Sequence, residues 1–461
     1  MLSPRPYRSG FLVAGVSSVL TVLLLTLGLV SSASGLAACG GHPAAAASKS
    51  AIEDKVASHV SAWPVWGFNT ARTRVGPNIT VPNPNKTSVL WKQTEIVKNA
   101  AGQTTQFGDL IEYPPSISGG KVFYCTNGGG QGGQVICRDL LTGVERWRYK
   151  IPAKQGGQFA AEPAVSGDVV YVGTMGPRKG RGNPNYKPQL LALQADTTAP
   201  EGKLLWSFTT GHAVESSPMV LGNRLYFSSQ AGTLYCFSTS PDLTNPEPLW
   251  TRNLGGKTTS SPAYDLNGRI ITSTYTGIVW AFDQNSGAVR WKNKVPGSNA
   301  QFYGTPAVYG TRVVVASKAN GKLYCLDDHT GHTLWTYATG QGLYASPAVW
   351  NNTIYIGSKF KCFWAIDVRT GMPATNWPRS KILLHRYPGP IFGSASVLNG
   401  VVYFSSFPGA GAKKGTTYAI DARTGAKKWQ FNDGYYSPVT ATSAVALITG
   451  HHTIYAFKAQ P

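Results

Sequence analysis

The sequence predicts an all-β fold, an eight-bladed β-propeller, from three observations: a repeated pattern, a series of hairpins, and a mismatch in their numbers. The repeated pattern is an apolar run that ends in aspartate, with glycine four residues later and tryptophan four residues after that. Its clearest copies are Val279–Trp291, Leu323–Trp335 and Thr417–Trp429, with weaker copies at Val135–Trp147 and Phe363–Trp377. A unit that returns every ~40–60 residues is typical of a repeat architecture.

One copy explains the residue types. Leu323 to Leu326 are apolar on both alternating faces, as in a strand that is covered on both sides. Asp327 can accept hydrogen bonds from turn amides, and Gly331 supplies the positive φ that a tight turn often needs. Trp335 then lies on the returning strand and is large enough to cover the next unit. These residues are therefore expected to build the fold.

The hairpins are short apolar strands in alternating pattern, broken by Asn-Gly, Gly-Asp or Gly-Asn turns. Eight of them start near Pro115, Pro163, Pro218, Pro262, Pro306, Pro347, Ala395 and Ser443.

The mismatch indicates how the fold closes. Seven tryptophans end outer strands, against eight hairpins: Trp147, Trp206, Trp250, Trp291, Trp335, Trp377 and Trp429. The segment Ser88–Trp91 looks like an outer strand but has no hairpin before it. It is expected to complete the blade that begins at Ser443, which closes the ring. Seven blades are the alternative if Phe363–Trp377 is irregular.

The amino terminus predicts export. Arg5 and Arg8 precede an apolar run from Phe11 to about Val30, and small residues lead to Leu36–Cys39. This ending resembles a bacterial lipobox, which predicts lipidation of Cys39; an uncleaved membrane anchor is the alternative. We expect a signal or anchor over residues 1–39, a flexible Ala/Ser tether over 40–60, and the propeller over 61–461.

The charge balance points to anionic surroundings. The 461 residues carry 42 Lys and Arg against 21 Asp and Glu, a formal net charge of +21. Such a surface attracts envelope polymers, lipid head groups or nucleic acid, and export argues against nucleic acid. A solvated basic surface without a partner is the alternative.

The segments Ala281–Trp291 and Ala419–Trp429 read Ala-x-Asp-x-x-x-Gly-x-x-x-Trp, and the folded part opens with Trp-Pro-Val-Trp-Gly-Phe-Asn at Trp63. These features resemble the propeller repeats of pyrroloquinoline-quinone (PQQ)-type proteins, from about Trp63 to the end. The resemblance implies a quinoprotein-like propeller. The family holds quinoprotein dehydrogenases and also non-enzymatic lipoproteins such as the outer-membrane assembly factor BamB.

Markers of quinone chemistry are scarce. The resemblance implies, for an enzyme, a Ca²⁺-bound quinone, a carboxylate base and often a disulfide between adjacent cysteines, but the sequence has no Cys-Cys pair and no C-x-x-C-H haem motif. Glu162 and Glu215, each just before an inner strand, are the best-placed candidate cofactor ligands, although such carboxylates more often cap turns. We predict no catalytic residue, no metal site and no cofactor, with PQQ and Ca²⁺ only under the enzyme alternative.

The cysteines leave their pairing open. Cys125 and Cys137 lie on consecutive strands of one blade, so a disulfide between them is feasible outside the cytoplasm. Cys236 and Cys325 occupy equivalent strand positions and are expected to be free.

One face of the propeller is predicted to bind a partner, because long loops on a rigid scaffold often carry function. Loops within blades seven, one and two give a basic ridge on that face, made of Arg178, Lys179, Arg181, Lys187, Lys413 and Lys414. Loops between blades bring aromatic residues to the central funnel: Phe159, Phe302, Tyr303, Tyr344, Tyr387, Phe392, Tyr435 and Tyr436. Such groups around a concavity are typical of recognition sites; the alternative is that the aromatics fill the funnel as core.

The sequence therefore predicts a non-enzymatic envelope lipoprotein that binds an envelope protein or an anionic polymer. It is expected to be a monomer anchored to the outer face of the cell membrane. A PQQ-dependent oxidoreductase and a sensor of sugars or cell-wall fragments are the alternatives.

Overall fold

The computed structural model describes residues 69, 71–96, 110–128, 132–152, 156–159, 161–177, 183–239, 245–297, 299–377, 387–436 and 439–461. All of them belong to the second of the chain's two compact units, Met1–Ala46 and Ala47–Pro461. These described residues form strands and turns and no α-helix. They accordingly include no helix long and apolar enough to cross a membrane. Cys39, the tether and residues 63–68 of the opening lie outside them.

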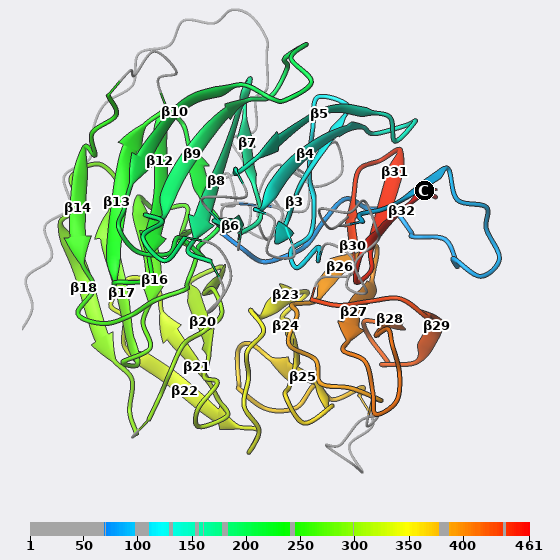
Figure 1. Cartoon of the computed structure of the whole chain (residues 1–461). Coiled ribbons are helices and arrows are strands. Elements are labelled where there is room, and N and C mark those ends of the chain that lie inside the picture. Colours follow the sequence, from blue (N-terminus) through cyan, green and yellow to red (C-terminus); the bar gives the residue numbers. More distant parts are fainter. Residues whose placement is uncertain are drawn as a thin grey trace, which may run out of the picture. The chain divides into compact units, whose positions relative to one another are not determined.

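The first four blades follow one another along the chain as antiparallel sheets (Figure 1). Blade one is β2 (Ser116–Ser118), β3 (Lys121–Thr126), β4 (Gln134–Asp139) and β5 (Glu145–Lys150). Blade two is β6 (Gln158–Phe159), β7 (Ala164–Ser166), β8 (Val169–Met175), β9 (Gln189–Gln194) and β10 (Leu204–Thr209), with β6 and β7 both paired to β8. Blade three is β11 (Met219–Leu221), β12 (Arg224–Ser229), β13 (Thr233–Ser238) and β14 (Trp250–Asn253). Blade four is β15 (Ala263–Tyr264), β16 (Arg269–Ser273), β17 (Ile278–Asp283) and β18 (Val289–Lys294).

The remaining blades continue the series. Blade five is β19 (Ala307–Tyr309), β20 (Arg312–Ala316), β21 (Lys322–Asp327) and β22 (Thr333–Ala338). Blade six is β23 (Ala348–Trp350), β24 (Thr353–Gly357) and β25 (Phe363–Asp367). Blade seven is β26 (Ser396–Leu398), β27 (Val401–Ser406), β28 (Thr416–Asp421) and β29 (Lys427–Phe431). Blade eight is β30 (Val439–Ala441), β31 (Val445–Thr449), β32 (Thr453–Lys458) and β1 (Trp91–Thr94).

The predicted closure is confirmed. β1 pairs antiparallel with β32, with Trp91 opposite Ala456 and Thr94 opposite Thr453. The innermost strand of blade one, β2, contacts both β30 of blade eight and β7 of blade two. The eight sheets thus form a closed ring, which leaves only the outer strands as edges.

Blade six departs from the pattern, as the weak Phe363–Trp377 repeat indicated. It has three described strands, and a single bridge between Ile366 and Pro373 takes the place of a fourth. Trp377 still docks on the next blade, where its indole Nε1 donates to the carbonyl oxygen of Ala422 at 2.9 Å. The blade count therefore stays at eight despite the irregular unit.

The repeated aspartate and glycine are explained by the turn that they form. Asp283 Oδ1 accepts the amides of Asn285 and Ser286 at 3.0 and 2.8 Å, which satisfies turn amides that would otherwise lack a partner. Gly331, the equivalent of Gly287, has φ of 73°, and a Cβ there would stand 2.5 Å from the ring of Trp291. Glycine is needed at this position because the backbone is left-handed and a neighbouring blade lies against it.

The repeated tryptophan joins neighbouring blades. Trp291 of blade four lies on the Gly331 turn of blade five and donates from Nε1 to the carbonyl oxygen of Asp328 at 2.8 Å. Trp147 and Trp335 donate in the same way to Ala195 and Val368. These three interfaces combine a large aromatic contact with a hydrogen bond from the indole N–H, whereas the buried indole N–H groups of Trp206 and Trp250 have no partner among the described residues.

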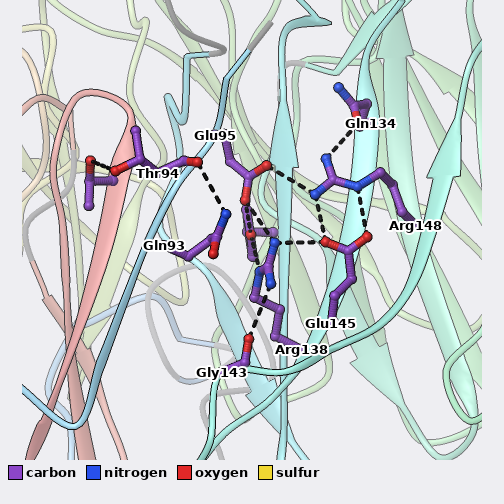
Figure 2. A network of polar contacts seen from close by, with 10 residues as sticks. Gln93, Thr94, Glu95, Gln134, Arg138, Gly143, Glu145 and Arg148 are labelled. Carbon is purple, nitrogen blue, oxygen red and sulfur yellow. Dashed lines mark hydrogen bonds and ion pairs between the residues drawn. The ribbon is translucent and has the colours of Figure 1, made fainter.

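Closure between blades eight and one also uses ion pairs, which we call the closure network: Glu95, Arg138, Glu145 and Arg148 (Figure 2). Glu95 directly follows the closing strand and is buried, and its two carboxylate oxygens accept from Arg138 and Arg148, each at 3.1 Å. Both arginines also reach Glu145 Oε2, at 2.7 and 2.6 Å. The network ties the amino-terminal strand to β4 and β5 of blade one.

Cys125 and Cys137 lie on neighbouring strands, as predicted, but they do not form a disulfide. Cys125 lies opposite Val135 and Cys137 lies opposite Phe123, so the two cysteines are diagonal neighbours rather than a facing pair. All five described cysteines are free and buried, Cys125, Cys137, Cys236, Cys325 and Cys362. Burial raises the pKa of the Cys137 and Cys325 thiols to about 12, so both behave as apolar core residues.

Candidate functional site

Five hydroxyl residues occupy one equivalent position, just before the inner strand of each of blades three to seven. We call them the hydroxyl ring: Ser217, Ser261, Thr305, Ser346 and Ser394. The amides of the first four donate to the hydroxyl oxygen of the next blade, as Ser261 N does to Thr305 Oγ1 at 3.1 Å and Thr305 N to Ser346 Oγ at 2.9 Å. The chain starts at Glu162 of blade two, whose amide donates to Ser217 Oγ at 3.1 Å. The ring therefore links successive blades around the axis.

Two arginines from the amino-terminal segment lie beneath this ring. The carbonyl oxygens of Ala71, Thr73 and Arg74 accept the amides of Val308, Val349 and Val397, which come three residues after the ring positions of their blades. Arg72 Nε donates to the carbonyl oxygen of Pro262 at 2.9 Å, and Arg74 Nε to that of Ala395 at 2.6 Å.

Both arginines are buried with φ near +60°, a costly conformation for a side-chain-bearing residue that the surrounding contacts hold in place. The amino-terminal segment therefore closes the channel from below.

Glu162 is the carboxylate of this axial cluster, which we define as Arg72, Arg74 and Glu162. It is fully buried; Ser116 Oγ lies 3.1 Å from its Oε1, and Oε2 has no hydrogen-bond partner among the described residues. Burial raises the pKa of Glu162 to about 8, and the positive charges of Arg74 and Arg72 oppose that rise. The same burial lowers the pKa of Arg72 to about 9 and that of Arg74 to about 10.

A cavity of about 370 Å³ opens above the hydroxyl ring and defines the candidate site. All five ring residues line it, together with Glu215, Thr259 and Lys359. Its aromatic lining consists of Tyr113, Tyr303, Tyr344, Phe392 and Tyr436. The volume lies at the lower end of the range for small-molecule pockets.

The aromatic lining belongs to a longer run of touching rings, the aromatic belt: Tyr275, Tyr303, Tyr344, Phe392, Phe407, Tyr436 and Tyr113. Successive ring centroids are separated by 4.8 Å (Phe407 to Tyr436) to 6.4 Å (Tyr436 to Tyr113), with edge-to-face contacts in the middle of the belt and a stacked pair at each end. Such contacts fix ring orientations before any ligand arrives. The belt is a preformed wall contributed by seven blade-to-blade and within-blade loops, from blade four round to blade one.

Charged groups of both signs stand at the wall. Glu215 Oε1 accepts from Gln230 Nε2 at 2.8 Å; burial and the nearby Glu112 raise the pKa of Glu215, against the effect of Lys318. Lys318 Nζ lies 4.0 Å from the ring centroid of Tyr275 and 5.2 Å from that of Tyr303, a cation–π arrangement, and burial lowers its pKa. With Glu215 and Lys359, the lining of the cavity carries one acid and one base.

The predicted funnel aromatics divide into two groups. Tyr303, Tyr344, Phe392 and Tyr436 line the cavity, and Tyr435 stands behind them against Phe407 and His451. Phe159, Phe302 and Tyr387 are instead core residues with at most 7% exposure. For these three, the alternative of burial as core holds: Phe159 lies against Gly133, Phe302 against Tyr324 and Tyr387 against Phe404.

The basic ridge can be placed only in part. Arg178, Lys179 and Arg181 lie outside the described residues. Lys187, Lys413 and Lys414 are exposed, and Lys414 also pairs with the buried Asp433, with 3.0 Å between Nζ and Oδ2. Of the two candidate carboxylates, Glu215 lines the cavity, while Glu162 lies with the arginines of the axial cluster.

Sequence reasoning missed the hydroxyl ring, Arg72, Arg74, Lys318 and the Tyr113 and Phe407 rings. The ring did carry a signal, since Ser or Thr directly precedes the proline at Pro218, Pro262, Pro306 and Pro347. The two arginines carried none, because nothing local indicates that a loop before the first blade enters the channel.

Taken together, the fold and the site define an eight-bladed propeller of the quinoprotein type with a closed channel and an aromatic-walled funnel. A family model described as outer membrane protein assembly factor BamB matches residues 76–198, 131–241 and 241–460. The chain belongs to this family of PQQ-type repeat proteins.

Both BamB proteins and quinoprotein dehydrogenases are similar to this chain. The chain is 24% identical over 327 residues to the outer membrane protein assembly factor BamB of Moranella endobia, which covers 67% of this chain and 78% of that protein. A solved quinohemoprotein alcohol dehydrogenase from Comamonas testosteroni superposes with a TM-score of 0.64 at 14% identity, over 89% of this chain and 82% of that one. A europium-containing methanol dehydrogenase superposes at 0.63 with 12% identity, over 88% and 100%. At such identities, the two solved structures show the fold alone.

The described residues fit a calcium-bound quinone poorly. Ca²⁺ takes six to eight oxygen ligands, usually with several carboxylates, but Glu215 is the single carboxylate in the described cavity lining. Glu162 is faced by two buried arginines, whose charges oppose a divalent cation. A tricarboxylate quinone also favours a clearly basic lining, whereas Glu215 and Lys359 balance each other. We therefore derive no step through such a cofactor.

Proposed function

We propose that this protein is a non-enzymatic binding module of the cell envelope, which holds a partner protein at the rim of its funnel face. The observation that carries the proposal is the funnel itself, a preformed aromatic wall above a floor of hydroxyl groups. Membership of the BamB family, whose described role is outer membrane protein assembly, supports the same conclusion.

The rim offers groups suited to a protein surface. The loop between β27 and β28 brings Phe407 onto the aromatic belt and exposes Lys413, while Lys187 is exposed on the loop before β9. Aromatic residues in a concave centre with charged residues at the edge are the usual arrangement of a recognition surface. The basic groups speed the encounter with an acidic partner, and the aromatic groups hold it.

Export and anchoring complete the proposal. The basic, apolar and small-residue regions that end at Cys39 would place a lipid on the first residue of the mature protein, and the Ala/Ser segment would then act as a tether. The propeller would stand as a monomer on the outer side of the membrane, with its funnel face free to engage a partner.

Site-specific photo-crosslinking in the native cell tests the proposed face. A photoreactive residue at Lys413 is expected to trap a discrete protein partner. The same residue at Arg423 is the matched control, because it lies in the same blade but at the other end of β28, in the Asp421–Gly425 turn. Equal crosslinking from both positions, or none from Lys413, would contradict the proposal. A crosslink to polymer in place of a discrete protein band, lost in high salt, would favour the anionic polymer.

A thermal melt separates the enzyme alternative. PQQ with Ca²⁺ is expected to leave the melting temperature unchanged, since the described part of the cavity lining offers the metal one carboxylate, Glu215. A rise in melting temperature with stoichiometric quinone absorbance would favour an oxidoreductase instead, because a ligand that binds only the native state stabilises it.

A further inference from the structure

We infer that the funnel cavity is a binding site for a neutral saccharide of one or two pyranose rings. This inference goes beyond the protein partner proposed for the rim. It concerns the floor and wall of the cavity, which the rim loops surround.

The hydroxyl ring supplies the first step. Each of its oxygens accepts one backbone amide from the preceding blade, at 2.8 to 3.1 Å. None of the five hydroxyls donates to another group among the described residues, so each keeps a proton and a lone pair for a ligand. A group that both donates and accepts matches a sugar hydroxyl, which also does both. A carboxylate or an ammonium would use only one of these capacities.

The aromatic belt supplies the second step. Tyr303, Tyr344 and Phe392 are held in tilted and edge-to-face contacts at 5.6 and 5.1 Å, on one side of the cavity above the hydroxyl ring. Ring faces fixed in this way offer flat apolar area at little cost in conformational entropy. The C–H face of a pyranose is flat and apolar, while its edge is polar. An apolar wall above a polar floor complements that shape.

The charge balance supplies the third step. Among the described residues, one acid, Glu215, and one base, Lys359, line the cavity, so this part of the lining carries no net charge. Glu215 keeps Oε2 available beyond its bond from Gln230, and can accept from a pair of sugar hydroxyls. An anionic ligand would be repelled by Glu215, and a cationic ligand would be repelled by Lys359. A neutral polyhydroxylated ring avoids both penalties.

The size of the site sets the length of the ligand. A cavity of about 370 Å³ with a closed floor, where Arg72 and Arg74 fill the channel, accepts a ligand end rather than a chain that passes through. The terminal rings of a glycan fit this description.

Calorimetric titration and saturation-transfer NMR test the site on the exported propeller. The probes are glucose, N-acetylglucosamine and their β-1,4-linked disaccharides, with the acyclic polyol sorbitol as a comparison because it lacks a rigid apolar face. At least one of the cyclic sugars is expected to bind saturably and sorbitol is not. Absence of saturable binding by all four sugars would overturn the inference.

Variants locate the binding. Tyr344→Ala is expected to weaken the best sugar at least tenfold, whereas Tyr344→Phe keeps the ring face and most of the affinity. Tyr337→Ala is the matched control, since Tyr337 lies on the outer strand β22 of the same blade and packs against Trp364, away from the funnel. Near-UV circular dichroism confirms that each variant is folded. Affinity unchanged by both Tyr344→Ala and Phe392→Ala would place the sugar elsewhere and contradict the site.

The two proposals fail separately. Loss of sugar binding in Tyr344→Ala with crosslinking from Lys413 intact would separate the cavity from the rim. Loss of the crosslink alone would leave the saccharide site standing.

Discussion

The closure network and the funnel are both polar regions of the same propeller, but they use their polar groups differently. In the closure network, Glu95 is buried and both of its oxygens are paired with arginines. In the funnel, each hydroxyl oxygen of the ring accepts one amide from the neighbouring blade, and its proton and second lone pair remain available for hydrogen bonds. Polar groups that are fully paired stabilise a fold; polar groups with capacity left over are available to a ligand.

The largest effect is expected where the pairing is complete. Glu95→Ala would remove the buried carboxylate that pairs with both Arg138 and Arg148 and would release the closing strand from blade one. Breaking a buried ion pair from one side costs about 3–5 kcal/mol, so chemical denaturation should show a loss of this order. Lys92→Ala, on the same strand but exposed, is the control. If Glu95→Ala lowered the free energy of unfolding no more than Lys92→Ala does, closure of the ring would depend on β1–β32 pairing alone.

A smaller loss in the free energy of unfolding is expected from substitutions in the hydroxyl ring. Thr305→Val keeps the shape of the side chain but leaves the amide of Ser261 without an acceptor, which costs about 1–3 kcal/mol. Thr305→Ser restores the oxygen and should restore most of the stability measured by urea unfolding. If the valine variant were as stable as the parent protein, the ring would have no structural role between blades.

The axial cluster predicts a dependence of stability on pH. Because burial raises the pKa of Glu162 from its ordinary 4.5 to about 8, the native state binds a proton more tightly than the unfolded state does. The stability from this group is therefore fully present below the ordinary pKa and is lost as pH rises through about 8.

Urea unfolding between pH 5 and pH 9 measures this effect. Glu162→Gln is always neutral and should remove that part of the decline, so the gap between variant and parent should change with pH. A gap that stays constant over this range would contradict the buried titration.

The smallest effect is expected at the rim. Lys187→Ala and Lys413→Ala remove exposed charges, and such changes usually alter stability by less than about 0.5 kcal/mol. If the rim binds an acidic partner, the double variant should lose capture by a photoreactive residue placed at the neighbouring exposed Ala412, while its melting temperature stays that of the parent. A large fall in melting temperature would mean that these lysines support the fold instead.

The sequence alone determined the fold, because its signals are local. The Asp283 turn, the Gly331 backbone and the Trp291 contact each depend on residues within one repeat or on the repeat that follows. The unmatched strand at Trp91 predicted the closure, since a ring leaves no strand without a partner.

The site depended on the tertiary structure. Tyr303, Tyr344, Phe392 and Tyr436 were predicted from their loops, but Phe159, Phe302 and Tyr387 have the same local pattern and are buried in the core. Whether an aromatic residue on a blade-to-blade loop faces the funnel depends on how neighbouring blades pack, which no single repeat encodes. Arg72 and Arg74 depend still more on packing, because their partners at Pro262 and Ala395 lie 190 and 321 residues away. A repeat sequence specifies its own turns and strands, whereas the axis exists only once all the blades have closed around it.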